Sequence, residues 1–318
     1  MSEQTSAPRV GIIGLGLIGG SLALALRDTR AASTVLAWDP ARAALEAGLQ
    51  GGVIDAAAAS LEALLDEVDI VVLAAPTVAC AGLLERILAR GGAWHCVTDV
   101  ASVKGPLVEA AARLGDAARR FVPGHPIAGS ERSGVTAARA DLFRNHRVIL
   151  TPDAATDAAA LEAVRTLWRC AGAEVCTMDV EEHDAVLAAT SHLPHVLAFA
   201  LVDALARAPA RDDIFRFAAG GFRDFTRIAS SDPVMWRDVS LANRDALLAT
   251  LDDFAARLAV LRSAIERGDG DALEATFRSA KQARDAYARG VPGSRAGHDA
   301  PEVTGLTATS GTGGTRGE

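Results

Sequence analysis

The sequence predicts an α/β domain with a doubly wound parallel sheet, followed by an all-helical domain. In the first half, short β-branched segments alternate with alanine-rich helical segments, which is the pattern of parallel strands joined by crossover helices. After residue 178 the strand pattern almost disappears. The length of 318 residues also exceeds the usual size of one domain. We therefore expect two domains.

The first domain is expected over residues 8–178. Its predicted strands are residues 9–13, 34–38, 70–75, 95–99, 147–151 and 174–177. The predicted helices between them include residues 19–27, 41–48, 79–90 and 103–114. Strands and helices in this alternation form a sheet covered on both faces.

The second domain is expected over residues 179–290. Asp179 and Glu182 have the spacing of a capping box and predict a helix over 180–206. This segment is apolar nearly all round, which implies burial on several sides. A second copy of the chain could supply one of them, so we expect a homodimer through this domain.

Three further helices are predicted in the second domain, over residues 212–230, 234–265 and 269–288. Asp232 followed by Pro233 is a favourable start for the second of these. Residues 291–318 are rich in Gly, Thr and Ser and poor in large apolar side chains. Such a segment cannot offset the entropy of ordering, so we expect a disordered tail.

Composition excludes several classes of function. The formal net charge of −8 provides no extended basic surface, so nucleic acid is an unexpected partner. The polar N-terminus lacks the features of a secretory signal. No apolar run approaches the roughly 20 residues that cross a bilayer, since even residues 70–75 end at Pro76. We therefore expect a soluble, cytoplasmic protein without a membrane span.

The four cysteines, Cys80, Cys96, Cys170 and Cys176, have no C-x-x-C spacing. Neither a zinc site nor a disulfide framework is indicated, and buried reduced thiols are expected. Lys104 and Lys281 are the only lysines among 32 basic residues. A lysine that persists in such a chain indicates a positional role, which we expect for Lys104.

Residues 10–21 read VGIIGLGLIGGS. They place Gly14, Gly16 and Gly19 in the G-x-G-x-x-G spacing between a predicted strand and a predicted helix, the context that makes this motif informative. The glycines allow a tight turn, close approach of the pyrophosphate and helix packing, while the N–H groups at the start of the helix bind phosphate. Leu17 and Ile18, between the second and third glycines, are also expected to bind the cofactor. The alternative is a glycine-rich turn without a ligand.

Asp39 ends the second predicted strand, 25 residues after Gly14. A carboxylate here would accept hydrogen bonds from the adenine ribose and repel a 2′-phosphate, which predicts NAD rather than NADP. Asp39 could also cap the following helix, with Pro40 at its first position. The two roles are compatible.

Two further segments bear candidate catalytic residues. The strand over 95–99 continues into DVASVKG, where Ser102 could either face the ligand or cap the next helix. His125 lies in PGHPIAGSE, predicted to be a loop, and histidine is suited to accept a hydroxyl proton near neutral pH. A lone histidine is more often structural, but beside a nucleotide motif His125 becomes the leading base.

In the second domain, His192 and His195 stand at i and i+3 around Pro194, which should kink the helix. A metal pair is conceivable, but without a third ligand hydrogen-bonding roles are favoured and no metal is expected. Arg227 could form an ordinary helical ion pair with Asp224.

The segments GLGLIGGS, DVASVKG, PGHPIAGSE, TSHLPH and GFRDFTRIASSDPVMWRD occur in this order over residues 9 to about 290. As an ordered set they resemble the prephenate and arogenate dehydrogenase family. The resemblance implies a Rossmann domain followed by a helical dimerisation domain. It also implies NAD-dependent oxidative decarboxylation of prephenate to 4-hydroxyphenylpyruvate in tyrosine biosynthesis.

Applied to this sequence, the resemblance implies that His125 accepts the proton of the ring C4 hydroxyl and that Ser102 hydrogen-bonds this hydroxyl. His195 would contact the substrate or order the site. Arg227 would pair with a substrate carboxylate, Arg223 would lie at the pocket entrance, and Glu131 would gate the pocket.

Three alternatives remain open at this stage. Arogenate could replace or accompany prephenate as substrate, because the two differ only in a keto or amino group. A 3-hydroxyacid-type dehydrogenase would require a catalytic lysine on a helix of the second domain, where Lys281 stands. The alternative outside the enzymes is a nonenzymatic protein that senses NAD.

Overall fold

The computed structural model describes residues 7–130 and 132–290. The expected disordered tail lies outside these ranges, as does Glu131. Contacts divide the chain into two compact units that meet between Asp253 and Phe254. The predicted domain boundary at 178/179 falls inside the first unit, between its last strand and the helix that follows.

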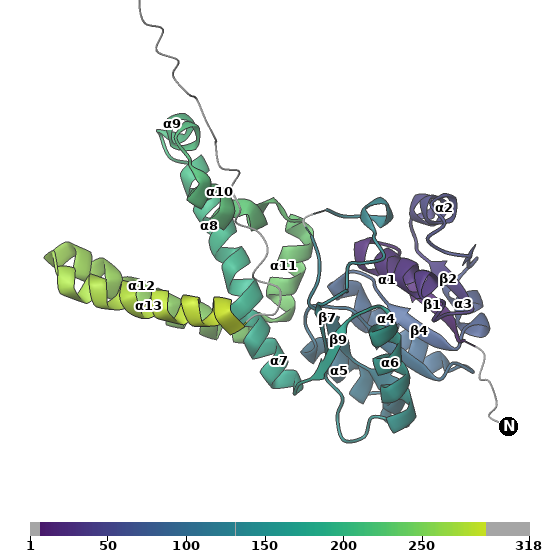
Figure 1. The fold of residues 1–318 in the computed structure, drawn as a ribbon. Coiled ribbons are helices and arrows are strands. Elements are labelled where there is room, and N and C mark those ends of the chain that lie inside the picture. The colour runs from purple at the N-terminus through teal and green to yellow at the C-terminus, as the bar shows by residue number, and fades with distance from the viewer. Residues whose placement is uncertain (1–6, 131, 291–318) are drawn as a thin grey trace, which may run out of the picture. The chain divides into compact units, whose positions relative to one another are not determined.

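A six-stranded parallel sheet forms the centre of the first unit (Figure 1). Its strands are β1 (Arg9–Ile13), β2 (Thr34–Trp38), β3 (Ala56–Ala57), β4 (Ile70–Leu73), β5 (Cys96–Asp99) and β6 (Phe121–Val122). The spatial order is β3-β2-β1-β4-β5-β6, which reverses between β1 and β4 as in dinucleotide-binding sheets. This topology confirms the predicted doubly wound fold.

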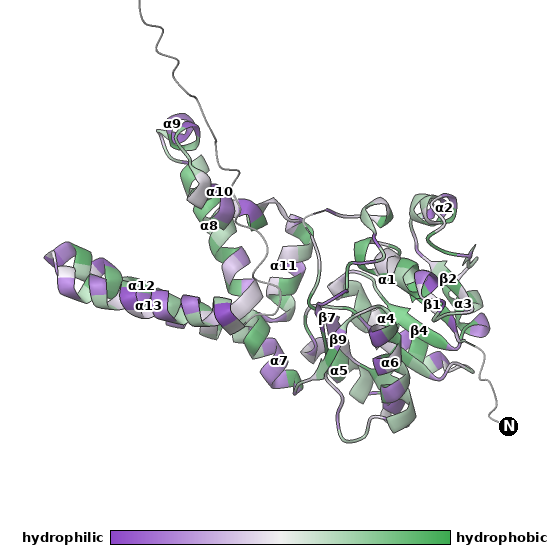
Figure 2. Ribbon diagram, viewed as in Figure 1, coloured by the Kyte–Doolittle hydropathy of each residue, from purple (hydrophilic) through white to green (hydrophobic). Residues whose placement is uncertain are grey.

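Helices accompany this sheet in the order α1 (Leu17–Asp28), α2 (Arg42–Gln50), α3 (Leu61–Glu67), α4 (Thr77–Arg90), α5 (Gly105–Ala112) and α6 (Ala158–Cys170). The sequence analysis did not predict α3 or α6. In β4, Ile70 and Val72 enter one hydrophobic core, whereas Val71 and Leu73 enter another. Both faces of the sheet are therefore covered, which explains why β4 is hydrophobic along its length and β1 is buried after Arg9 (Figure 2).

A second, three-stranded sheet contains β7 (Gly124–Pro126), β8 (Arg147–Leu150) and β9 (Glu174–Thr177). β7 is antiparallel to β8, and β8 is parallel to β9. Two predictions need correction here. The strands over 147–151 and 174–177 exist but belong to this separate sheet, and the segment around His125 is a short strand rather than a loop. Short 3₁₀ turns, η1 (Gly115–Arg120) and η2 (Val135–Ala137), lie before β6 and after β7.

The predicted helix over 180–206 is present but interrupted. It consists of α7 (Val180–Leu187), a π-helical turn η3 (Ala188–His192) and α8 (Leu193–Ala206), with Pro194 in the first turn of α8. The disturbance expected from Pro194 therefore takes the form of a widened turn before it. The capping box was wrong, because the Asp179 side chain makes no capping hydrogen bond.

The predicted helix over 269–288 is confirmed as α13 (Gly270–Gly290), whereas the other two predicted helices are divided into shorter ones. Residues 212–230 form α9 (Arg211–Arg216), α10 (Gly220–Thr226) and a 3₁₀ turn η4 (Arg227–Ser230), and residues 234–265 divide into α11 (Pro233–Ala242) and α12 (Arg244–Arg267). The predicted cap at Asp232 is confirmed, since its Oδ1 accepts the N–H of Met235 at 2.8 Å. The second unit contains the end of α12 and α13 (Gly270–Gly290), joined through Gly268 at φ +65°.

The segment Val180–Ala206 is, by length and composition, apolar enough to cross a bilayer, contrary to the expectation from apolar runs. However, it carries three histidines, and two of them, His183 and His192, are fully buried. They form hydrogen bonds with His125 and Asn243, respectively, elsewhere in the unit. In α8 only Ala198 is buried. Most of the apolar side chains of α8, which were predicted to be buried, are thus only half-buried within a single described chain.

Candidate active site

The glycine loop between β1 and α1 fits a dinucleotide. Gly14 has φ +97°, and a Cβ there would lie 2.6 Å from the carbonyl oxygen of Ala74. A Cβ at Gly19 would collide with the carbonyl oxygen of Gly14, whereas Gly16 faces open space. The first turn of α1 has no side-chain cap, so its N–H groups, those of Leu17 and Ile18 among them, can serve a phosphate.

Asp39 lies beside this loop at the end of β2. Its Oδ2 accepts the N–H of Leu15 at 2.8 Å, and its Oδ1 accepts the N–H of Ala41 at 2.7 Å. A carboxylate has about four acceptor positions, so it retains capacity for ribose hydroxyls. Asp39 is not the N-cap of the following helix, because α2 begins at Arg42 with Ala41 as its N-cap.

A hollow of about 480 Å³ adjoins Asp39 and is lined by residues from β2, α2 and the segment after β3, including Trp38, Leu45 and Ala58. Apolar walls beside a carboxylate suit an adenosine, whose base is apolar on its faces and whose ribose donates hydrogen bonds. The residues present therefore fit the adenosine half of NAD.

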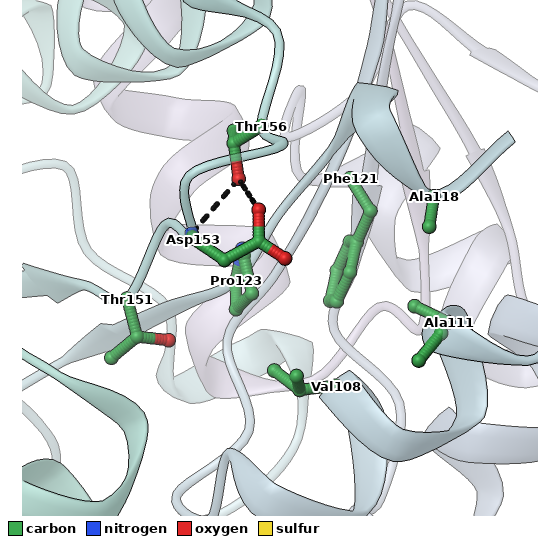
Figure 3. Close-up of a pocket in the computed structure, with 9 residues that line it drawn as sticks. Val108, Ala111, Ala118, Phe121, Pro123, Thr151, Asp153 and Thr156 are labelled. Carbon is green, nitrogen blue, oxygen red and sulfur yellow. Dashed lines mark hydrogen bonds between the residues drawn. The ribbon is translucent and has the colours of Figure 1, made fainter. Parts of the chain in front are cut away.

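A smaller hollow of about 50 Å³ lies between α5 and the segments after β6 and β8 (Figure 3). It is lined mainly by apolar side chains such as Val108 and Phe121. The carboxylate of Asp153 is engaged by the hydroxyl of Thr156 at 2.9 Å and the N–H of Ala155. This hollow has room for a water or two rather than for a substrate.

A buried ion pair fixes the carboxyl end of β5. Lys104 and Asp99 are both fully buried, and the ammonium contacts the Asp99 carboxylate. Lys104 Nζ also donates to the carbonyl oxygen of Gly124 at 2.6 Å, and Asp99 Oδ1 accepts the N–H of Gly124 at 3.0 Å. The pair thus holds the residue immediately before His125, which is the positional role expected for Lys104.

His125 is buried and forms one end of a line of hydrogen bonds. Its Nδ1 lies 2.9 Å from Nε2 of His183, and Nδ1 of His183 lies 2.7 Å from Oδ1 of Asp184. Burial, followed by the nearby charge of Lys104 and the neighbouring His183 and His192, lowers the pKa of His125 well below its ordinary value. Neutral imidazole, the form able to accept a proton, is therefore favoured.

A second group of side chains connects this line to α8. Asn243 Nδ2 donates to the backbone carbonyl of Asp184 at 2.8 Å and to Nδ1 of His192 at 3.0 Å. Burial lowers the pKa of His192 to about 4. Trp236 lies edge-on to His192. It also stacks on His195, and the ring centroids of Trp236 and His195 are 3.4 Å apart. His192 and His195 thus share a face, as predicted, and both have hydrogen-bonding roles.

His195 is half-buried, and its Nδ1 donates to the carbonyl of Ser191 at 2.8 Å. Burial, together with the positive charge of Arg227, lowers its pKa despite that hydrogen bond. Arg227 is exposed in η4 and is close enough to act electrostatically on His195. The two predicted residues therefore lie in one region.

The other predicted residues are less closely connected. Ser102 is half-buried in the loop between Asp99 and Lys104, and it does not cap α5, whose N-cap is Lys104. Arg223 is exposed on α10, one turn before Arg227. Glu131 lies outside the described residues. Among the residues that are described, no group of three His, Cys, Asp or Glu side chains is placed to hold a metal ion.

The cysteines take no part in this site. All four are free thiols, and Cys80 and Cys96 are buried whereas Cys170 and Cys176 are only partly so. Burial raises the pKa of both Cys80 and Cys96 to about 12. Neither is a nucleophile at neutral pH.

Four residues of the site were not predicted from the sequence: His183, Asp184, Trp236 and Asn243. Trp236 stood in a quoted motif without a role. The signal for His183 and Asp184 was that they end a run of four polar residues, 181–184, on a helix otherwise expected to be buried, since buried polar groups require partners. Asn243 gave a weaker signal, as a residue that favours helix ends.

Comparisons with known proteins assign the chain. Residues 22–177 match the family model described as "Prephenate dehydrogenase, nucleotide-binding domain", and residues 179–279 match "Prephenate dehydrogenase, dimerization domain". Prephenate dehydrogenase of Bacillus subtilis is 40% identical over 277 residues, covering 86% of this chain and 74% of the relative. Cyclohexadienyl dehydrogenase of Zymomonas mobilis is 38% identical, covering 88% and 96%.

Among solved structures, prephenate dehydrogenase from Aquifex aeolicus, in complex with hydroxyphenyl propionate and NAD+, superposes with a TM-score of 0.83. It is 35% identical and covers 90% of this chain and 100% of its own. With both domain models matched in order, and with relatives above 30% identity over most of their length, the chain belongs to the prephenate dehydrogenase family.

Proposed function

We propose that this enzyme catalyses the oxidative decarboxylation of prephenate to 4-hydroxyphenylpyruvate with NAD, as a soluble cytoplasmic enzyme of tyrosine biosynthesis. The observation that carries the proposal is His125, a buried imidazole of lowered pKa on β7, in a chain whose β1–α1 glycine loop fits a dinucleotide. The relatives named prephenate dehydrogenase, and the neighbour that holds NAD+ with hydroxyphenyl propionate, a phenol like the expected product, support it.

His125 is the general base. NAD, when bound, supplies the acceptor for the hydride of the C4–H bond. His125 accepts the C4 hydroxyl proton as the carbonyl forms, and it can return this proton to the phenolate oxygen once CO₂ has left and the ring is aromatic. Ser102 hydrogen-bonds the same hydroxyl. The residues thus need only position the substrate and move one proton, since aromatisation provides the driving force.

Arg227, Arg223, His195 and Glu131 form the substrate-binding side. Arg227 pairs with a substrate carboxylate, because a guanidinium matches that group with two parallel hydrogen bonds. His195 orders the site from its stacked position on Trp236. Arg223 lies at the entrance and Glu131 gates it. Residues 8–178 bind the dinucleotide, and residues 179–290 complete the substrate site and the dimer.

Arg227→Ala should raise KM for prephenate by about 10²-fold, the cost of losing a charge-assisted pair worth roughly 3 kcal/mol. The expected effect on kcat is small, because the contact is made in both ground state and transition state. Steady-state kinetics against Arg207→Ala, which removes an exposed arginine paired with Asp203, check this. An unchanged KM would place the carboxylate elsewhere.

Asp39→Ala should raise KM for NAD and increase the relative efficiency with NADP. The change removes both the ribose acceptor and the charge that repels a 2′-phosphate. The ratio of kcat/KM for the two cofactors is the measurement. A ratio equal to that of the wild type would show that another residue sets cofactor preference.

The chain should form a homodimer through the helical domain. Only Ala198 of α8 is fully buried in one chain, and Leu241 of α11 and Leu248 of α12 are 65% and 46% exposed. Surfaces of this kind mark interfaces. Light scattering at micromolar concentration should give twice the chain mass, and a monomeric mass would contradict the expectation.

The activity itself is tested by following NAD reduction at 340 nm with prephenate and, separately, with arogenate. Arogenate is the second candidate, because a cyclohexadienyl dehydrogenase is 38% identical to the chain. Turnover of prephenate with a higher kcat/KM than arogenate is expected. A higher kcat/KM for arogenate would make arogenate the proposed substrate. Binding of NAD without turnover of prephenate or arogenate would favour a sensing role.

A 3-hydroxyacid-type reaction is the weaker enzyme alternative. Its catalytic lysine would have to be Lys281, the only lysine of the helical domain. Lys281 lies on α13, with its side chain 76% exposed, and pairs with Asp285 one turn later at 2.5 Å. This is an ordinary surface ion pair of a helix.

A further inference from the structure

The line of hydrogen bonds behind His125 has a single consistent direction. We propose that His183 and Asp184 are positioning residues that hold the proton of His125 on Nδ1, leave Nε2 free as the base, and share the positive charge when the base is protonated. This inference rests on the proposed role of His125. It extends the site to α7, beyond the residues that the sequence analysis selected.

The direction begins at Asp184. Its carboxylate accepts the N–H of Lys104 at 2.9 Å and the N–H of Gly105 at 2.8 Å, in addition to His183. Burial alone would raise the pKa of Asp184, but these three hydrogen bonds outweigh it and lower the pKa. An ionised carboxylate only accepts hydrogen bonds, so Nδ1 of His183 must carry the proton that faces it.

The next two steps follow from the tautomers of neutral imidazole. With its proton on Nδ1, His183 presents an unprotonated Nε2 to His125 and accepts a hydrogen bond there. Nδ1 of His125 must therefore be the donor, and its remaining ring nitrogen, Nε2, holds the lone pair. Free histidine prefers the opposite tautomer, so the partner residues decide which nitrogen is basic.

The same line supports the charge that forms during turnover. When Nε2 of His125 takes the hydroxyl proton, the ring becomes an imidazolium bonded to His183. The Nδ1 proton can then move to Nε2 of His183, which places the positive charge directly beside the Asp184 carboxylate. No proton is lost, and both shifts reverse when His125 returns its proton to the phenolate.

Such support is needed because the other groups around His125 oppose its protonation. Lys104 at the start of α5 and His192 in η3 lower the pKa of His125, as does His183 when its own ring carries a charge. Asp99 offsets the charge of Lys104 but is engaged with it. Asp184 is thus the carboxylate connected to the base, through His183.

The protein with ¹⁵N-labelled histidine tests the tautomers directly. Solid-state ¹⁵N spectra distinguish protonated from unprotonated ring nitrogens, and His125→Asn and His183→Gln assign the signals. We expect both His125 and His183 to carry the proton on Nδ1 at pH 7.5. A proton on Nε2 of His125, or a doubly protonated His183, would overturn the proposal whatever the kinetics.

Kinetics of α7 variants separate positioning from packing. His183→Leu should lower kcat by about 10²-fold or more with KM for prephenate nearly unchanged, since losing the group that fixes a tautomer costs up to about 10⁴ in a Ser-His-Asp triad. His183→Gln, whose amide oxygen can still accept from Nδ1, should recover to within about tenfold of the wild type. Leu187→Ala, one turn further along α7 and also buried, is the packing control.

Equal losses in His183→Leu and His183→Gln, or a loss in Leu187→Ala as large as in His183→Leu, would overturn the positioning role. Failure of the proposed function is distinguishable: it would appear as full activity in His125→Asn. If His125→Asn is inactive while His183→Leu keeps wild-type kcat, only the inference about His183 and Asp184 is wrong.

Discussion

His125→Asn is expected to lower kcat by about 10²- to 10⁴-fold, the usual cost of losing a general base, while KM for prephenate changes little. Asparagine retains a polar side chain of similar reach, but it has no nitrogen that can accept a proton at neutral pH. The loss should therefore fall on the chemical step. Steady-state kinetics with saturating NAD measure it.

The pH profile provides an independent check on His125. Its pKa is lowered by burial and by Lys104, and the active form is neutral, so activity is retained as the pH falls through the ordinary histidine value near 6.5. It is lost only as the pH falls through the lowered pKa, and this acid limb should vanish in the variant. His146→Gln, at an exposed histidine, should keep the limb. If His125→Asn keeps wild-type kcat, His195 is the next base to test.

Lys104→Met should destabilise the protein by about 3–5 kcal/mol, because it leaves the buried carboxylate of Asp99 without its counter-charge. Methionine has nearly the volume of lysine, so the loss is electrostatic rather than a cavity. The carbonyl of Gly124 loses its donor as well. Denaturant unfolding at pH 7 gives the free energy of unfolding, and activity should fall because Gly124 precedes the base.

Two further variants are the controls for Lys104→Met. Lys281→Met removes an exposed lysine and should change the free energy of unfolding by under about 1 kcal/mol. Adding Asp99→Asn to Lys104→Met removes the stranded charge and should recover part of the loss. A Lys104→Met protein as stable as Lys281→Met would mean that the buried pair contributes nothing.

The main sheet was predictable because its strands are continuous apolar segments, separated by helical periodicity and turn residues. β7 was not, because Gly124, His125 and Pro126 have no strand signal of their own. They become a strand only by pairing with β8, more than 20 residues later. β3 and β6 have two residues each, too few for any period to be visible.

The site was predictable where one residue type does one chemical task, as with the glycines of the loop, Asp39 and His125. His183 and Asp184 are neighbours in sequence, but their other partners, and those of Asn243, are 50 or more residues away. No local pattern contains that information. The predicted helix over 234–265 likewise missed the break at Asn243, whose side chain is drawn to His192 and to the carbonyl of Asp184.

The attachment of α7 to α5 has a consequence for motion. Asp184 is bonded to the first N–H groups of α5, and α11 contacts α4 nearby. If α7 and α11 slid along the sheet, both the hydrogen bonds of Asp184 to α5 and the contact of α11 with α4 would break. A rocking movement about the line that joins these two contacts would preserve both. Substrate entry by rocking would widen the site away from this axis. His125 is hydrogen-bonded to His183, the residue before Asp184, so it would move little and its orientation would be set before the substrate arrives.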